Sequence, residues 1–156
     1  MMKGQRPGEK FMRVDFYQLS RDPAEKVVPL LARATARAGE RLLVVSDDPA
    51  QLQGISDALW DQGGGSFLAN GLAGAGHEER QPALLSSTME ARNGAKYCAL
   101  ADGKWRDQAD GFARVFLLFG DANLTEARAC WRMLDGREDM ERNFWKQEAG
   151  QWTKAA

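Results

Sequence analysis

Two aspartates stand where an α/β protein commonly places a catalytic or phosphate-binding group. Asp47 and Asp48 follow the short apolar run Leu42–Val45 and precede Pro49. Carboxylates at the carboxyl end of a strand can bind Mg²⁺, which would serve nucleotide chemistry. A carboxylate followed by proline is also a common start of a helix, with the side chain capping free backbone N–H groups. The helix-cap interpretation needs no metal, and we favour it.

The other reactive residue types lack the partners that their chemistry requires. The glycines 63–65 follow a helical pattern and lack the lysine and hydroxyl residue of a phosphate-binding loop. His77, the only histidine, lies in a polar loop with no residue at metal-ligand spacing. Cys98 and Cys130 have no neighbouring cysteine or histidine, which predicts inert thiols. The sequence therefore favours a binding module with no catalytic, cofactor or metal residues. A small nucleotide- or metal-dependent enzyme of doubly wound fold is the alternative.

Aromatic and basic side chains near the C-terminus give a stronger signal for binding. Arg128 and Arg132 are four residues apart on a predicted helix and lie beside its apolar stripe. The stripe, at helical spacing, consists of Leu124, Ala127, Trp131 and Leu134. Tryptophan and arginine dominate binding hot spots, so this cluster could receive a partner. Alternatively, Trp131 is a core residue and the two arginines are a solvated flank.

A second aromatic pair lies earlier in the chain. Trp60 ends the helical pattern over about 49–60, and Phe67 lies in the glycine-rich loop that follows. Two such rings can close over the core as a lid, or they can leave part of an apolar surface exposed to a partner. We expect the two side chains to lie close together.

Length and composition predict one ordinary globular domain. The chain has 156 residues, of which 28% are charged and 44% are hydrophobic. We assign the domain to residues 12–156 and interpret residues 1–11 as a loose N-terminal extension. The net charge of −1 disfavours non-specific nucleic-acid binding, which requires many phosphates to be neutralised. No apolar run approaches the length of a membrane span or a signal sequence, which predicts a cytoplasmic protein.

Apolar patterns predict alternating strands and helices. The expected strands are Arg13–Leu19, Leu42–Val45, Ala83–Ser86, Tyr97–Leu100 and Ala113–Leu118. The expected helices span about 23–38, about 49–60 and from residue 121 or 123 to about 134. Such alternation predicts a three-layer α/β/α domain with a mainly parallel, Rossmann-like sheet. The unbroken apolar run Leu42–Val45 should lie inside that sheet, because an exposed edge could not accommodate it.

Residues 59–74 carry several motifs in a fixed order: a leucine-tryptophan pair, a Ser-Phe-hydrophobic segment and a Leu-Ala-Gly triplet. This order resembles the chi subunit of the bacterial DNA polymerase III clamp-loader complex, and the resemblance covers roughly residues 12–152. The matching residues there are Leu59, Trp60, Ser66, Phe67, Leu68, Asn70, Leu72, Ala73 and Gly74. Further similar segments are 14–19, 81–85 and a tail that contains Arg128, Trp131, Trp145 and Trp152.

The resemblance implies a non-catalytic replisome adaptor, with any DNA polymerase activity belonging to the holoenzyme. Chi subunits link the clamp loader to single-stranded DNA-binding protein during replication, so contact with DNA would be mainly indirect. In that family, the aromatic residue and the arginine that correspond to Trp131 and Arg128 help to bind the C-terminal tail of single-stranded DNA-binding protein. The tail is acidic and ends in phenylalanine with a free carboxylate, which a guanidinium can bind in bidentate fashion.

We therefore expect Arg128, Trp131 and Arg132, together with Trp145, to border a groove for the tail. The family's lysine, about one turn before the arginine, is replaced here by Leu124, and Lys146 is the candidate substitute. The resemblance also places Trp60 and Phe67 on the docking surface for the psi subunit, if the organism has one, or for a helicase-like competitor.

Overall fold

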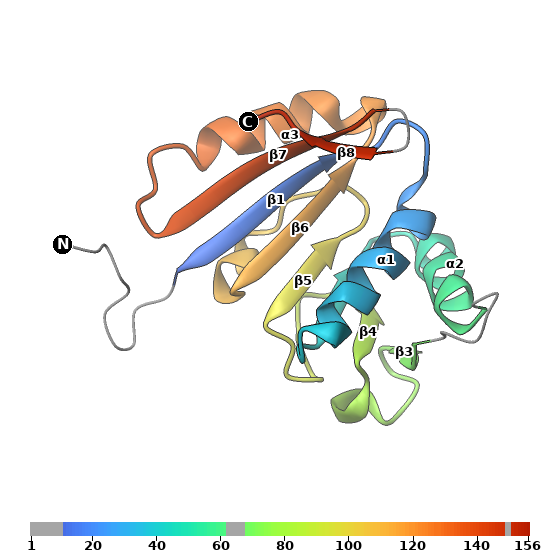
Figure 1. The fold of residues 1–156 in the computed structure, drawn as a ribbon. Helices are drawn as coiled ribbons and strands as arrows, with labels where there is room; N and C mark the ends of the chain where they lie inside the picture. Colours follow the sequence, from blue (N-terminus) through green and yellow to red (C-terminus); the bar gives the residue numbers. More distant parts are fainter. Residues whose placement is uncertain (1–10, 62–67, 149–150) are drawn as a thin grey trace.

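The computed structural model describes residues 11–61, 68–148 and 151–156, and these residues form one eight-stranded sheet with helices on both faces (Figure 1). The strands follow the order β3-β4-β2-β5-β6-β1-β7-β8, and only the β7–β8 pair is antiparallel. The strands are β1 Met12–Gln18, β2 Leu42–Val45, β3 Asn70–Leu72, β4 Ala83–Ser86, β5 Tyr97–Leu100, β6 Arg114–Phe119, β7 Met140–Glu148 and β8 Gln151–Lys154. The α-helices are α1 Ala24–Arg37, α2 Pro49–Trp60 and α3 Leu124–Met133.

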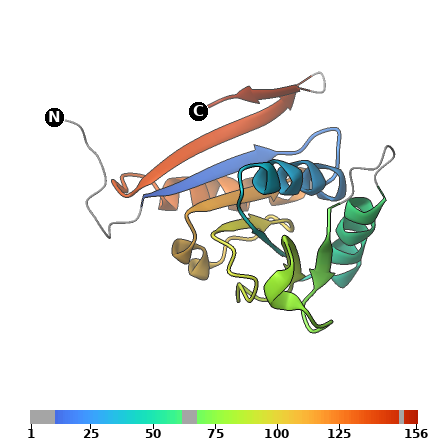
Figure 2. The same ribbon diagram turned by 60° about the horizontal axis from the view of Figure 1, so that its bottom comes forward.

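The helices divide into two layers. Val27, Val28 and Ile55 of α1 and α2 are buried with Leu42 and Val44, which lie on one face of β2. Ala127 and Cys130 of α3 are buried with a separate set of residues on the opposite face of the sheet. Figure 2 shows α1 and α2 on one side of the sheet and α3 on the other. The predicted three-layer α/β/α fold with a mainly parallel sheet is confirmed.

The segment from β2 to α2 agrees with its sequence prediction. β2 lies between β4 and β5, and all four of its residues are fully buried. Asp48 caps α2, because its Oδ1 accepts a hydrogen bond of 3.0 Å from the backbone N–H of Ala50. Asp47 forms ion pairs with Lys104 at 3.1 Å and Arg106 at 3.0 Å. The helix-cap interpretation is therefore confirmed for Asp48, whereas Asp47 pairs with basic side chains and does not cap the helix.

A buried carboxylate joins the three strands at the centre of the other half of the sheet. The side chain of Asp15 on β1 is completely buried. It forms ion pairs of 3.1 Å with Arg13 Nε and 3.0 Å with Arg114 Nη2. It also accepts hydrogen bonds of 3.0 Å from Asn143 Nδ2 and 3.1 Å from Trp145 Nε1. This network joins side chains of β6, β1 and β7 to a single carboxylate.

Three strands were not predicted. β3 has only three residues, and β7 and β8 occupy a region that was interpreted as a C-terminal tail. β7 pairs in parallel with β1 along its length, so that Met12 lies opposite Met140 and Gln18 opposite Lys146. Consequently β1 is an interior strand, and the sheet extends two strands beyond it. The bounds of β1 and β6 differ from their predictions by one residue at each end.

Candidate functional site

Trp131 is a half-buried residue at the interface between α3 and the sheet. Its ring meets the ring of Phe16 on β1 edge-on, with centroids 5.2 Å apart. It also meets Phe144 on β7 at 5.7 Å, again in an edge-to-face arrangement. Trp131 therefore packs on the core, as expected if it is a core residue. Part of its side chain nevertheless remains accessible.

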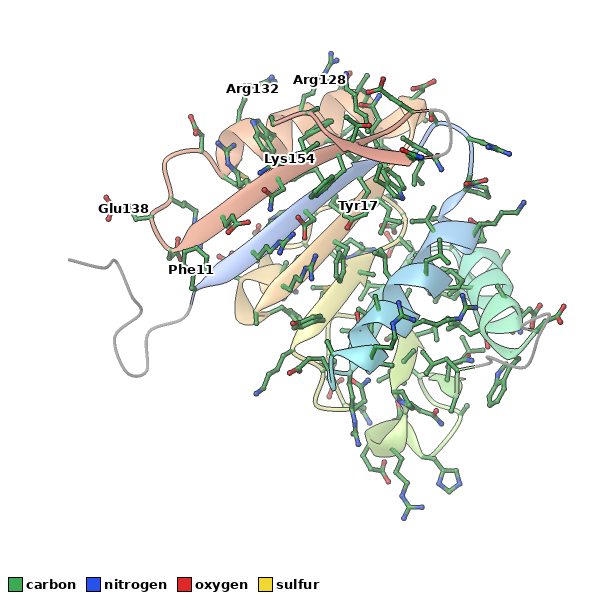
Figure 3. The ribbon with its side chains drawn as sticks, in the orientation of Figure 1. Phe11, Tyr17, Arg128, Arg132, Glu138 and Lys154 are labelled. Carbon is green, nitrogen blue, oxygen red and sulfur yellow. The ribbon has the colours of Figure 1, made fainter. Side chains whose placement is uncertain are left out.

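Arg128 and Arg132 lie beside Trp131 on the outer surface of α3. Both are exposed, and their side chains extend away from the sheet (Figure 3). Neither forms an ion pair or a side-chain hydrogen bond with any residue that the structure describes. Because their charges are not neutralised within the described chain, both guanidinium groups are free to bind an external anion.

Arg142, which was not identified from the sequence, covers the ring of Trp131. Its guanidinium carbon lies 4.0 Å from the centroid of the indole, which is cation–π geometry. Its Nη1 donates to the carbonyl oxygen of Trp131, and its Nη2 pairs with Asp135 Oδ1 at 2.7 Å. The alternation of Met140, Arg142 and Phe144 along a strand was the signal that could have placed this side chain toward α3.

Lys146 and Trp145 lie on opposite faces of β7. Lys146 is exposed and shares the α3 face with Arg142 and Phe144, because alternate residues of a strand point to the same side. Trp145 points to the α1 face, where its Nε1 donates to Asp15. The prediction that Trp145 borders one groove with the α3 residues is therefore wrong.

We call the remaining residues the α3 surface: Arg128, Trp131, Arg132, Arg142 and Lys146. It combines four basic side chains with one half-buried aromatic ring in a chain whose net charge is −1. Comparison with protein families matches residues 11–141 to the DNA polymerase III chi subunit, HolC. The chain belongs to the DNA polymerase III chi subunit family. It is accordingly an accessory subunit of DNA polymerase III, and the family resemblance seen in the sequence is confirmed.

The chi-family match includes most of the candidate residues. Trp60, Arg128, Trp131 and Arg132 lie inside the matched range, whereas Arg142 and the rest of the C-terminal hairpin lie beyond it. No curated protein matches the sequence closely enough to be identified as a relative. Within the described part of the chain, none of the helices is long and apolar enough to cross a membrane.

The second predicted surface is described only in part. Trp60 is the last residue of α2, and 51% of it is exposed. Phe67 lies outside the described residues, so the expected proximity of the two rings stays a prediction. Beyond the undescribed segment, the backbone N–H of Leu68 donates to the carbonyl of Leu59 at 2.9 Å, which returns the chain to the end of α2.

A hollow of about 480 Å³ lies at the carboxyl ends of β1, β5 and β6, where doubly wound proteins often bind ligands. Its lining includes the carboxylates Asp22, Glu25, Asp102 and Asp121. Asp102 pairs with Arg106 at 2.9 Å, and Asp22 accepts a hydrogen bond from Gln147. Among the described residues, no three His, Cys, Asp or Glu side chains are grouped as a metal site requires.

The two cysteines should be unreactive in the folded protein. Burial raises the pKa of both the Cys98 and the Cys130 thiols to about 12. We expect a disulfide reagent at pH 8 to label neither thiol in native protein and both in urea. Labelling of the native protein at pH 8 that is as fast as in urea would contradict this prediction.

The same burial should make stability depend on pH. Because unfolded thiols ionise near pH 8.5, the free energy of unfolding should fall as the pH rises from about 9 to 12.

Proposed function

We propose that this chi-family protein is a non-catalytic adaptor of the bacterial replisome. It links the clamp-loader complex to single-stranded DNA-binding protein by holding the acidic C-terminal tail of the latter. Its contact with DNA is mainly indirect, and it works in the cytoplasm, where replication takes place. The observation that carries the proposal is the pair of exposed arginines, Arg128 and Arg132, beside the half-buried ring of Trp131.

The chemistry of the α3 surface suits a peptide that ends in phenylalanine. A guanidinium group binds a carboxylate through two parallel hydrogen bonds, which contributes about 1.5–3 kcal/mol. Burial of the phenylalanine ring against Trp131 would contribute about 2 kcal/mol. After the cost of association, such a contact should be weak alone, and several tails on one tetramer would strengthen it.

Lys146 supports the same proposal from β7. The family's lysine before the arginine is absent here, but Lys146 is exposed on the strand face that also bears Phe144 and Arg142. In our proposal it supplies the charge that the missing lysine provides in other chi subunits. Arg142, whose charge is paired with Asp135, holds Trp131 in place.

Removal of the Arg128 guanidinium should weaken binding of an acidic, phenylalanine-ended peptide about tenfold or more. Calorimetry at two salt concentrations measures this, with wild-type affinity expected at about micromolar and lower in high salt. Arg80→Ala is the matched control, because Arg80 is an exposed arginine next to β4, far from α3 in the sheet order. Equal affinities for the wild type and Arg128→Ala, with no salt dependence, would refute the proposed pocket.

The clamp loader is the second partner in this proposal, and we place its contact at Trp60 with Phe67. An exposed tryptophan at a helix end is a typical interface anchor. Trp60→Ala should abolish capture of purified clamp-loader subunits, including a psi-like subunit if one exists, and leave affinity for the tail peptide unchanged. Undiminished capture by Trp60→Ala would remove this contact from the proposal.

The hollow at the strand ends is the observation that favours the alternative, a nucleotide-dependent enzyme. Its carboxylates would repel phosphates unless a divalent cation lay between them. A thermal-shift measurement compares the tail peptide with ATP and Mg²⁺. If ATP with Mg²⁺ raised the melting temperature of the protein and the peptide did not, the enzyme would be favoured over the adaptor.

A further inference from the structure

One side of the sheet is only partly covered by helices. On the side of α1 and α2, these helices lie over the part of the sheet that contains β2, β4 and β5 (Figure 1). No described helix lies over β1, β7 and β8 on that side (Figure 2). The uncovered face is opposite the α3 surface, so a ligand bound to one does not contact the other.

An apolar groove of about 230 Å³ lies where α1 meets this uncovered face. Its lining residues are Tyr17, Val27, Leu30, Leu31, Trp145 and Trp152. Leu30 is 58% exposed, which is unusual for a leucine. The ring of Trp152 meets that of Tyr17 edge-on at 5.0 Å, and the Trp145 indole is fixed by its hydrogen bond to Asp15. The walls are therefore held in place before any ligand binds.

The helix side of the groove is bordered by positive charge. Lys26, Arg33 and Arg37 stand four residues before, three after and seven after Leu30, so all three share its side of α1. The acidic residue of α1, Glu25, lies on the other side of the helix, where its side chain approaches Gly54 of α2.

On the sheet side, basic residues outnumber acidic ones by one. Arg13, Arg114 and Lys154 occupy positions on this face of β1, β6 and β8. The acidic residues at the corresponding positions are Asp15, which is buried between the two arginines, and Glu141, which is 3.8 Å from Arg13. Figure 3 shows Tyr17 and Lys154 on the side of the sheet turned toward the viewer. An acidic partner would be attracted here, although the whole chain carries a net charge of −1.

We infer that this groove binds an acidic segment of another protein that inserts one bulky apolar side chain between Leu30 and the two tryptophans. The aliphatic wall of Val27, Leu30 and Leu31 suits such a side chain better than it suits a nucleobase, which prefers flat aromatic platforms. The edge-on contact between Trp152 and Tyr17 also gives no row of parallel rings for stacking bases. This inference goes beyond the tail-binding proposal and uses a different face of the sheet.

A short peptide tests the inference: one leucine or phenylalanine flanked by aspartate and glutamate, with an amidated C-terminus that removes the free carboxylate. In NMR spectra of ¹⁵N-labelled protein, we expect the indole N–H signals of Trp145 and Trp152 to shift and that of Trp60 to stay unchanged. Replacement of the central apolar residue by glycine should reduce the affinity at least tenfold, and salt should weaken binding.

Leu30→Glu should reduce peptide affinity at least tenfold, because it places a negative charge and a polar group in the groove. Met133→Glu is the matched control, since Met133 is also 58% exposed but lies on α3. Binding that is lost in Arg128→Ala and retained in Leu30→Glu would assign the peptide to the α3 surface and overturn the inference. Indole shifts with oligothymidylate and none with the peptide would identify a nucleic-acid surface and overturn it too.

Discussion

Asp15→Ala should lower the free energy of unfolding by about 3 kcal/mol or more. The substitution leaves the guanidinium groups of Arg13 and Arg114, together with the N–H donors of Asn143 and Trp145, without their shared acceptor. The two arginines are partly exposed and can regain water, whereas Asn143 is buried and cannot. Urea denaturation followed by circular dichroism gives the change in unfolding free energy.

Asp135→Ala provides the comparison for this measurement. Asp135 also pairs with an arginine, Arg142, but 73% of its side chain is exposed. Exposed ion pairs contribute at most about 1 kcal/mol, so this variant should be nearly as stable as the wild type. If the two variants lost equal stability, the Asp15 network would not act as a buried junction between strands.

Trp131→Ala should lower the free energy of unfolding by about 3 kcal/mol. The indole contacts Phe16 and Phe144 and supports the guanidinium of Arg142, so its removal leaves a cavity between α3 and the sheet. Trp60→Ala, at an exposed helix end, should cost less than about 1 kcal/mol. Chemical denaturation of the two variants and the wild type under identical conditions measures both changes.

Trp131→Phe separates the structural and binding roles of this position. Phenylalanine keeps most of the packing, and the variant should lose less stability than Trp131→Ala. A Trp131→Ala variant as stable as the wild type would contradict the packing role assigned to the ring. Trp131 would then be an exposed residue whose only role is binding.

The interior of the sheet and its helices were predictable because their patterns are local. An unbroken apolar run predicts a strand buried on both faces, and Leu42–Val45 is such a strand. An aspartate followed by proline predicts a helix start, and Asp48 caps α2. The short strand β3 has no such pattern. Its position depends on pairing with β4 and on the hydrogen bond from Ser56 to the buried Asn70.

The candidate-site residues on α3 could be predicted from the sequence, whereas those on β7 could not be placed. Arg128, Trp131 and Arg132 share one side of α3 because their spacing is helical. In β7, large apolar residues alternate with charged ones only in part, and the segment was not identified as a strand. Without that assignment, nothing indicated that Trp145 and Lys146 point in opposite directions, or that Arg142 reaches Trp131.

The interior position of β1 has a consequence for biosynthesis. Among the described strands β1 is synthesised first, but its partners in the sheet come far later: Asp15 is 99 residues from Arg114 and 128 from Asn143. At a synthesis rate of about 5–20 residues per second, β1 waits about 6–26 s for both neighbouring strands. During that interval Val14 and Phe16 have no strand beside them, and a charged residue within the segment discourages pairing with other nascent chains. We therefore expect Asp15 to disfavour aggregation of the unfinished polypeptide before it joins the strands of the folded protein.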